Sequence, residues 1–220
     1  MDTAPQPDTQ QTRVVVIDDH PLFRKGVEDL IDMSSGLVLV GEAADGESGI
    51  RLAADVGPDL ILLDLNMKGM DGIETLKRLR ELDLDARVVM LTVSDNEDDV
   101  VAALRAGADG YLLKDMEPED ILAALERVTQ GRMALSERLA ELIARALREE
   151  PRPTHIAEAG LTPREEGILG LLERGYSNKL IARELDLSVG TVKVHVKHIL
   201  KKLRLKTRVE AAVWAVQSHH

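Results

Sequence analysis

The chain has 220 residues, of which 44% are hydrophobic and 30% are charged, with a formal net charge of −11. This balance is typical of a globular protein with one or two domains. The absence of cysteine excludes disulfides, thiolate zinc sites and cysteine nucleophiles. No apolar run approaches the length of a membrane-spanning helix, and residues 1–12 lack the pattern of a secretory signal. We therefore expect a cytoplasmic protein with a disordered tail over residues 1–12.

The charge is divided unevenly along the chain. Residues 1–150 hold 16 Lys and Arg against 32 Asp and Glu, whereas residues 151–220 hold 12 against 7. Within the second part, residues 187–208 carry seven basic residues and no acidic one. An acidic first part and a basic second part predict two domains with different partners, the second partner being a polyanion.

The first part of the chain alternates apolar runs with helical patterns. The runs lack polar alternation, which is typical of parallel strands buried on both faces. The expected strands are residues 13–19, 37–43, 59–64, 87–93 and 110–114, and the expected helices are residues 21–33, 46–56, 73–82, 97–106 and 118–130. Five such units predict an α/β domain over residues 13–131, with a doubly wound, flavodoxin-like (βα)5 parallel sheet.

A break separates this domain from the rest of the chain. Residues 136–148 have a modest helical period, which ends at the charged and Pro-containing residues 149–153. Prolines among charged and small residues are typical of a linker, so we expect a linker over residues 132–159 with a helix near 136–148.

The remaining residues, 160–217, are helical throughout in pattern. Residues 162–165 form a capping box that opens one helix, and three further helices have candidate caps at Ser177, Ser188 and Thr207. A short helix, a tight turn and a longer capped helix make a helix-turn-helix. We therefore expect an all-α, four-helix domain of the DNA-binding kind.

Four of the expected strands end on residues that phosphoryl chemistry can use. Asp18 and Asp19 follow the first strand, Asp64 the third, and Thr92 and Lys114 the fourth and fifth. Because the carboxyl ends of parallel strands face one crevice, these side chains should meet. The three carboxylates can hold Mg²⁺, while Asp64 can act as a nucleophile that forms an acyl phosphate. Lys114 would neutralise charge on the phosphoryl group, and the Thr92 hydroxyl would hydrogen-bond one of its oxygens.

The segments that carry these residues resemble the receiver domain of two-component response regulators. They are Val16-Ile17-Asp18-Asp19-His20, Leu63-Asp64-Leu65-Asn66-Met67, Leu91-Thr92 and Leu113-Lys114. The resemblance implies that Asp64 accepts phosphate from the phosphohistidine of a partner sensor histidine kinase. It also implies that the backbone carbonyl of Asn66 joins the Mg²⁺ site, and that Thr92 and Tyr111 form a switch pair.

One position in the acceptor loop departs from the family pattern. The family usually has proline where this chain has Lys68. Gly69 and Gly72 still allow the turn, so we expect the acceptor geometry to survive. The extra cation near Asp64 could alter the lifetime of the phosphate.

The longest helix expected in the second domain, residues 189–203, is basic and amphipathic. A helix in the major groove presents its early residues to base edges, which makes Lys193, Val194 and Lys197 candidate base readers. Ser188, Thr191 and the amides of the helix start could bind a phosphate. Four later basic residues are better placed for phosphates than for bases, and they are Lys201, Lys202, Arg204 and Lys206. His195 and His198 are expected to pack or face solvent, since no third metal ligand is suitably spaced.

This second domain resembles the LuxR-type four-helix DNA-binding domain. The segments that carry the resemblance are Leu161-Thr162-Pro163-Arg164-Glu165, Asn178-Lys179-Leu180-Ile181-Ala182 and Thr191-Val192-Lys193-Val194-His195. Both domains together resemble the NarL/FixJ class, and further segments resemble its nitrate- and nitrite-responsive members. The resemblance implies a homodimer on DNA, paired through the last helix. Val209, Val213 and Trp214 are candidate dimer residues, although packing within the four-helix unit is the alternative, and the favoured one for Val213.

The combined prediction is a transcription factor that is activated by phosphorylation. In the regulators that it resembles, the unphosphorylated receiver covers the recognition helix, and phosphorylation relieves this occlusion. Such a protein is not an enzyme beyond its own phosphotransfer and dephosphorylation.

Two alternatives stay open at this point. A magnesium-dependent phosphatase or phosphotransferase that acts on small molecules would need a second acid where Asn66 stands and an insertion that covers the substrate. A constitutive DNA-binding protein with an inert receiver would be unaffected by Asp64→Asn, although the intact acidic site argues against it.

Overall fold

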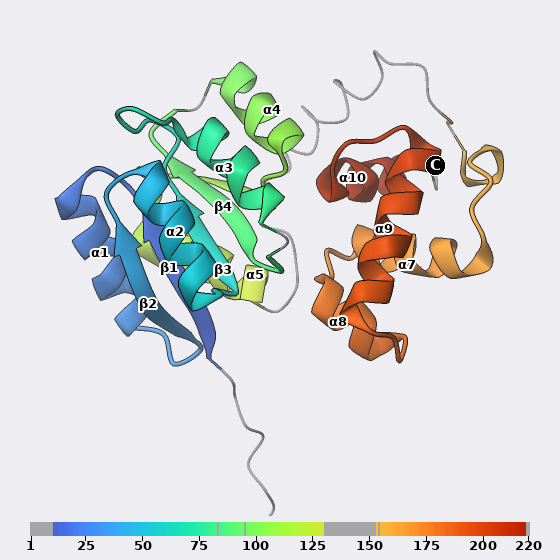
Figure 1. The fold of residues 1–220 in the computed structure, drawn as a ribbon, viewed down its shortest axis with the longest axis horizontal. Helices are drawn as coiled ribbons and strands as arrows, with labels where there is room; N and C mark the ends of the chain where they lie inside the picture. The colour runs from blue at the N-terminus through green and yellow to red at the C-terminus, as the bar shows by residue number, and fades with distance from the viewer. Residues whose placement is uncertain (1–10, 83, 95, 130–152, 154, 219–220) are drawn as a thin grey trace, which may run out of the picture.

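The computed structural model describes residues 11–82, 84–94, 96–129, 153 and 155–218. Figure 1 shows a sheet flanked by helices and, after it in the chain, a separate group of helices. The expected tail lies outside the described residues except for Gln11 and Thr12, and Thr12 already belongs to the first strand. The helix expected near residues 136–148 lies outside them altogether.

Five parallel strands form the sheet. They are β1 (Thr12–Ile17), β2 (Leu37–Ala43), β3 (Leu60–Leu63), β4 (Arg87–Thr92) and β5 (Gly110–Leu113). Their order is β2-β1-β3-β4-β5, and each neighbouring pair is parallel, which confirms the doubly wound topology. All residues of β3 and β4 are buried, because their uninterrupted apolar runs face helices on both sides.

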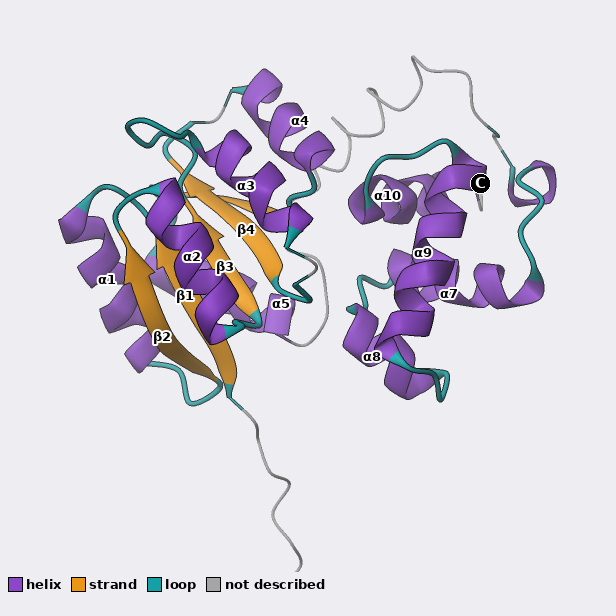
Figure 2. Ribbon diagram, in the orientation of Figure 1, coloured by secondary structure: helices purple, strands orange, loops and turns teal. Residues whose placement is uncertain are grey.

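Helices cover both faces of the sheet, as Figure 2 shows. They are α1 (Pro21–Asp32), α2 (Gly46–Val56), α3 (Gly72–Glu81), α4 (Glu97–Ala106) and α5 (Pro118–Thr129). Successive strand side chains point to opposite faces. Val14 and Val16 of β1 therefore pack with α1 and α5, whereas Val15 and Ile17 pack with α2, α3 and α4. This two-sided core holds the strand ends, and so the candidate site, in fixed positions.

The C-terminal domain consists of α7 (Pro163–Glu173), α8 (Asn178–Glu184), α9 (Val189–Leu203) and α10 (Arg208–Ser218). A short 3-10 turn, η1 (Ile156–Glu158), precedes them and was not expected. The capping box is present, and the hydroxyls of Ser177, Ser188 and Thr207 accept hydrogen bonds from the starts of the following helices. No helix in the described part of the chain is both long and apolar enough to cross a membrane.

Candidate functional site

The carboxyl ends of β1, β3 and β5 bring opposite charges into contact. Lys114 Nζ lies 2.6 Å from Asp18 Oδ2 and 2.9 Å from Asp64 Oδ2. All three side chains are at most 8% exposed. Short N–O distances at this depth mark charge-assisted hydrogen bonds that are shielded from water. We call the cluster of Asp18, Asp19, Asp64 and Lys114 the acceptor pocket.

Asp19 and His20 lie at the rim of the acceptor pocket. Asp19 Oδ2 accepts a hydrogen bond of 3.2 Å from the backbone N–H of Lys68. His20 Nδ1 lies 2.8 Å from Asp19 Oδ1, 3.3 Å from Asp18 Oδ1 and 3.9 Å from Asp64 Oδ2. His20 had no role assigned from the sequence, although its place directly after the acidic pair was a usable signal.

The donor set of this pocket fits a magnesium ion. Asp64 Oδ1 is buried and accepts no hydrogen bond from the described residues, while Asp19 Oδ1 faces the His20 imidazole. A buried carboxylate oxygen without a partner is costly, and a bound cation or water would remove that cost. Ligand atoms of Asp18, Asp19, His20 and Asp64 lie within 4.8 Å of one another, and a carboxylate-rich set suits Mg²⁺.

The loop after Asp64 is held close to the nucleophile by a glycine. Gly72 donates a hydrogen bond of 2.8 Å from its N–H to the carbonyl of Leu65. A Cβ at position 72 would lie 2.2 Å from the Asp64 carbonyl oxygen, so a side chain there would displace the loop. Gly69 has a φ of +81°. Asn66 and Lys68, which lie between Asp64 and Gly69, are exposed.

Thr92 and Tyr111 are linked through a residue that the sequence did not single out. Thr92 is fully buried, and its hydroxyl oxygen accepts a hydrogen bond of 3.2 Å from the Ser94 N–H. Tyr111 Oη donates to the Ser94 carbonyl at 2.8 Å, and Ser94 Oγ donates to Asp99 of α4 at 2.6 Å. Ser94 therefore connects the end of β4 to both β5 and α4.

Lys114 also packs on an aromatic ring. Its Nζ lies 4.4 Å from the centroid of the Phe23 ring of α1, a cation–π arrangement. Phe23 had no predicted role, because nothing in a linear motif places α1 beside the end of β5.

The candidate base readers occupy different environments on α9. Val194 is 54% exposed, and Lys197 is exposed as well. The Lys193 side chain is 30% exposed, and its Nζ lies 3.4 Å from Asp85 of the N-terminal domain. The helix start has the expected form, since Ser188 Oγ accepts from the Thr191 N–H at 3.0 Å. Part of the face that carries the candidate base readers is therefore covered by the N-terminal domain.

The later lysines and arginines of this region divide into two groups. Lys201, Arg204 and Lys206 are exposed, as phosphate contacts require. Lys202 is instead used inside the domain, because its Nζ bonds Glu165 at 2.6 Å and the Gly160 carbonyl at 2.9 Å. That bond and the capping box lower the pKa of Glu165 to about 2.

The candidate dimer residues lie inside the C-terminal domain. Val209, Val213 and Trp214 are at most 7% exposed, and Trp214 Nε1 donates a hydrogen bond of 2.9 Å to the Pro153 carbonyl. In the single chain, these side chains therefore pack within the C-terminal domain, as the alternative interpretation expected. Val216, which is 49% exposed, is the large apolar side chain that α10 leaves accessible.

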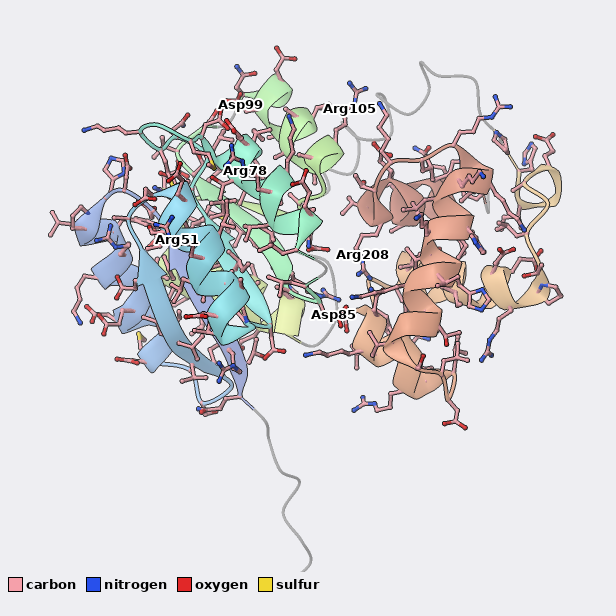
Figure 3. All side chains as sticks on the ribbon, viewed as in Figure 1. Arg51, Arg78, Asp85, Asp99, Arg105 and Arg208 are labelled. Atoms are coloured by element: carbon pink, nitrogen blue, oxygen red, sulfur yellow. The ribbon has the colours of Figure 1, made fainter. Side chains whose placement is uncertain are left out.

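Within the described part of the chain, three ion pairs join the two domains. Lys179 Nζ lies 2.6 Å from Asp59, Lys193 Nζ 3.4 Å from Asp85 and Arg208 Nε 3.8 Å from Asp109. In each pair the carboxylate belongs to the N-terminal domain and precedes β3, β4 or β5. Figure 3 shows Asp85 and Arg208 between the two domains. The contact is thus made at the amino-terminal ends of the strands, opposite the acceptor pocket.

Arginines surround the buried Asp109 at this contact. Burial alone would raise the pKa of Asp109, but the charges of Arg80, Arg208 and Arg87, together with the hydrogen bond from the Val88 N–H, leave it below its ordinary value. Arg80 Nη2 lies 2.5 Å from Asp109 Oδ2, which also accepts from the Val88 N–H at 2.9 Å. Burial in turn lowers the pKa of Arg87 to about 10, against the opposing effect of Asp109.

Comparison with known proteins gives both parts of the chain a family. Residues 14–126 match the response regulator receiver domain, and residues 159–215 match the luxR family of bacterial regulatory proteins. The nitrate/nitrite response regulator protein NarL of Escherichia coli K12 is 56% identical over 93% of this chain and 94% of its own length. NarP of the same strain is 44% identical, over 96% of this chain and 97% of its own length.

A solved structure covers both domains. The response regulator ChrA of a heme-sensing two-component system is 35% identical and has a TM-score of 0.51 to this chain. The match covers 95% of this chain and 98% of that one.

Proposed function

The chain belongs to the two-component response regulators that join a receiver to a LuxR-type DNA-binding domain, and on that basis we propose that phosphorylation of Asp64 controls its binding to DNA. Members of this family are transcription regulators and not enzymes. The observation that carries the proposal is the acceptor pocket, in which Lys114 bridges Asp18 and Asp64 and leaves Asp64 Oδ1 without a hydrogen bond.

Asp64 is the proposed nucleophile. Its Oδ1 attacks the phosphorus of a phosphohistidine on the sensor kinase, so that a P–O bond forms as the P–N bond breaks and its electron pair returns to the imidazole. Lys114 Nζ, already 2.9 Å from Asp64, pairs with a phosphoryl oxygen. The product is an acyl phosphate that adds negative charge at one point of the domain.

The proposed metal ligands are Asp18, Asp19, Asp64 and the backbone carbonyl of Asn66. When bound, Mg²⁺ supplies positive charge to the phosphoryl oxygens during transfer. His20 Nδ1, 2.8 Å from Asp19, lies within reach of the same atoms and restrains the Asp19 carboxylate. Lys68 donates its backbone N–H to Asp19, a hydrogen bond that the proline usual in the family could not donate at this position.

Helix α4 provides a physical route from Asp64 to the domain contact. Thr92 would turn its hydroxyl toward the new phosphoryl group to donate a hydrogen bond, and this rotation would move its oxygen away from the Ser94 N–H. Ser94 also holds Tyr111 and Asp99, so its movement shifts the start of α4. The helix has ten residues, or about 15 Å at 1.5 Å per residue, and Gly107 at its end contacts Arg80 beside the interdomain ion pairs.

The unphosphorylated, closed arrangement of the two domains is proposed to be the one that binds DNA less well. Lys193 faces Asp85, and Lys179 at the start of α8 is paired with Asp59, so cations of the helix-turn-helix are engaged by the N-terminal domain. Duplex DNA cannot reach these groups until the domains separate. Phosphorylation would relieve this occlusion by a population shift toward the open arrangement.

In the open form, Lys193, Val194 and Lys197 would read base edges in the major groove. Ser188, Thr191 and Lys201 would contact phosphates. A homodimer on paired half-sites is part of the proposal, with α10 as the pairing element. Because the side chains of Val209, Val213 and Trp214 are committed to the domain core, their role would be to fix the shape of α10.

The proposed signal and location follow from the relatives. The names of the Escherichia coli relatives refer to nitrate and nitrite, so nitrate- or nitrite-responsive genes are the proposed targets. Control of transcription requires access to DNA, which places the protein in the cytoplasm.

Binding of the full-length protein to an operator duplex tests the proposal. A small-molecule phosphodonor with Mg²⁺ should raise affinity at least tenfold for the natural chain and leave Asp64→Asn unchanged. Equal affinity of the natural chain with and without the phosphodonor, at confirmed phosphorylation of Asp64, would contradict it.

A further inference from the structure

His20 turns its imidazole toward the carboxylates of the acceptor pocket. Its Nδ1 atom lies 2.8 Å from Asp19 Oδ1, 3.3 Å from Asp18 Oδ1 and 3.9 Å from Asp64 Oδ2. Two ligands that each lie about 2.1 Å from one octahedral ion are roughly 3 Å apart when adjacent and roughly 4.2 Å apart when opposite. The three distances fall within or close to that range. The imidazole and the carboxylates are therefore placed to share one ion.

The backbone determines where this imidazole is attached. The His20 N–H donates a hydrogen bond of 2.8 Å to Asp18 Oδ1. The His20 carbonyl accepts hydrogen bonds from the N–H groups of Phe23 and Arg24, each at 3.1 Å. Pro21 restricts the residue before it to extended backbone, and His20 has a φ of −96° and a ψ of 104°. The side chain is 67% exposed, so the ring can adjust to an entering ion without displacing core residues.

Lys114 and His20 approach the Asp18 carboxylate from different oxygens. Lys114 Nζ bonds Asp18 Oδ2 and Asp64 Oδ2, whereas His20 Nδ1 faces Asp18 Oδ1. The Asp64 side chain is 2% exposed, and its Oδ1 accepts no hydrogen bond from the described residues. A buried carboxylate oxygen in that state is a ready ligand for a cation. The ammonium group of Lys114 can therefore stay in place while an ion binds beside the imidazole.

The donor atoms decide which cations such a site favours. Mg²⁺ prefers oxygen ligands, whereas imidazole suits first-row transition ions. We propose that His20 is a nitrogen ligand of the acceptor pocket, so that the pocket takes a divalent first-row transition ion as well as Mg²⁺. The inference rests on the metal site of the proposed function and names the class of cation that this site accepts.

His20 would act on the choice of cation and not on the nucleophile. Either kind of ion supplies positive charge to the phosphoryl oxygens beside Asp64. The ion that occupies the pocket would then depend on the concentrations of the two cations and on the affinity that the His20 nitrogen adds for the transition ion.

Calorimetric titration of the full-length, unphosphorylated protein with Co²⁺ and, separately, with Mg²⁺ tests the ligand. Because histidine is a common metal ligand, the adjacent His219 and His220 would bind Co²⁺ by themselves. Every protein in the test therefore carries His219→Ala/His220→Ala, and we call this double variant the parent. The test variant is His20→Asn. The matched control is His198→Asn, because His198 is exposed on α9, outside the pocket.

We expect the Co²⁺ affinity of the parent to fall about tenfold in His20→Asn and to stay unchanged in His198→Asn. The Mg²⁺ affinity should change by no more than about twofold in either variant, since Mg²⁺ relies on the carboxylates. Equal losses for the two ions would overturn the proposal, because His20 would then act only on the shape of the loop. Co²⁺ binding that is unchanged or tighter in His20→Asn would overturn it as well.

Proton NMR of the Co²⁺-bound protein gives a readout that a merely structural role would not move. Ring protons of an imidazole bound to Co²⁺ have large hyperfine shifts. These resonances should be present in the parent and in His198→Asn, and absent in His20→Asn. Their absence from the Co²⁺-bound parent would contradict the assignment of His20 as a ligand. Neither measurement uses phosphorylation, so a failure of the Asp64 switch and a failure of the His20 ligand give different results.

Discussion

Removing two partly exposed carboxylates of the domain contact should release the DNA-binding domain without phosphorylation. The change is the double substitution Asp59→Asn/Asp85→Asn, which removes the ion pairs that these carboxylates make with Lys179 and Lys193. These ion pairs are partly exposed, so each contributes about 0.2–1 kcal/mol. Their sum of about 1 kcal/mol corresponds to an increase of roughly fivefold in the open population and in operator affinity.

The assay is fluorescence anisotropy with a labelled operator duplex at low ionic strength, where surface ion pairs are strongest. Loss of two negative charges raises affinity for DNA by itself, so the control is Glu47→Gln/Glu74→Gln. Both control residues are more than half exposed at the starts of α2 and α3. The gain over this control should shrink as salt is raised. A double variant that binds no better than the control at low salt would refute the assignment of these pairs to the closed state.

Other substitutions probe the pocket and the helical domain separately. Gly72→Ala should lower the rate of phosphorylation by a small phosphodonor at least tenfold, because its Cβ would meet the Asp64 carbonyl; an unchanged rate would contradict the loop geometry. Glu165→Gln should cost about 1–2 kcal/mol at pH 7 in urea unfolding. Because the folded-state pKa of about 2 lies below the ordinary 4.5, this stability is present above pH 4.5 and is lost as the pH falls toward 2. A deficit that persists unchanged at pH 2 would contradict that role. Ser94→Ala should leave phosphorylation intact but weaken its effect on DNA binding, since the Oγ bonds to Asp99 and to the Asn96 N–H at the start of α4 are lost. A full response to phosphorylation would show that the Ser94 hydroxyl does not carry the signal.

Much of the fold could be predicted because its determinants are local. Apolar runs without alternation marked the strands, and side-chain caps such as Ser188 and the capping box at Thr162 marked the helix starts. The chemistry-bearing strand ends were also predictable, since a parallel sheet places Asp18, Asp64 and Lys114 at one edge.

The remaining features depend on contacts between distant segments. Ser94 belongs to the site because it is hydrogen-bonded to Tyr111 and Asp99, and Phe23 belongs to it because α1 packs beside Lys114. The carboxylates of the domain contact, such as Asp109, look in the sequence like ordinary turn residues. The basic residues that pair with them in the C-terminal domain come about a hundred residues later in the chain, so no local sequence pattern connects each carboxylate with its partner.

The most direct test of the account is the distance between the two domains before and after phosphorylation. Because the chain has no cysteine, Glu47→Cys/Gln217→Cys gives two defined spin-label positions, both exposed. Pulsed electron paramagnetic resonance should give a narrow distance distribution without the phosphodonor, and a longer, broader one with the phosphodonor and Mg²⁺. The same pair in an Asp64→Asn background should stay narrow. An unchanged distribution in the fully phosphorylated protein would contradict the claim that Asp64 controls release of the DNA-binding domain.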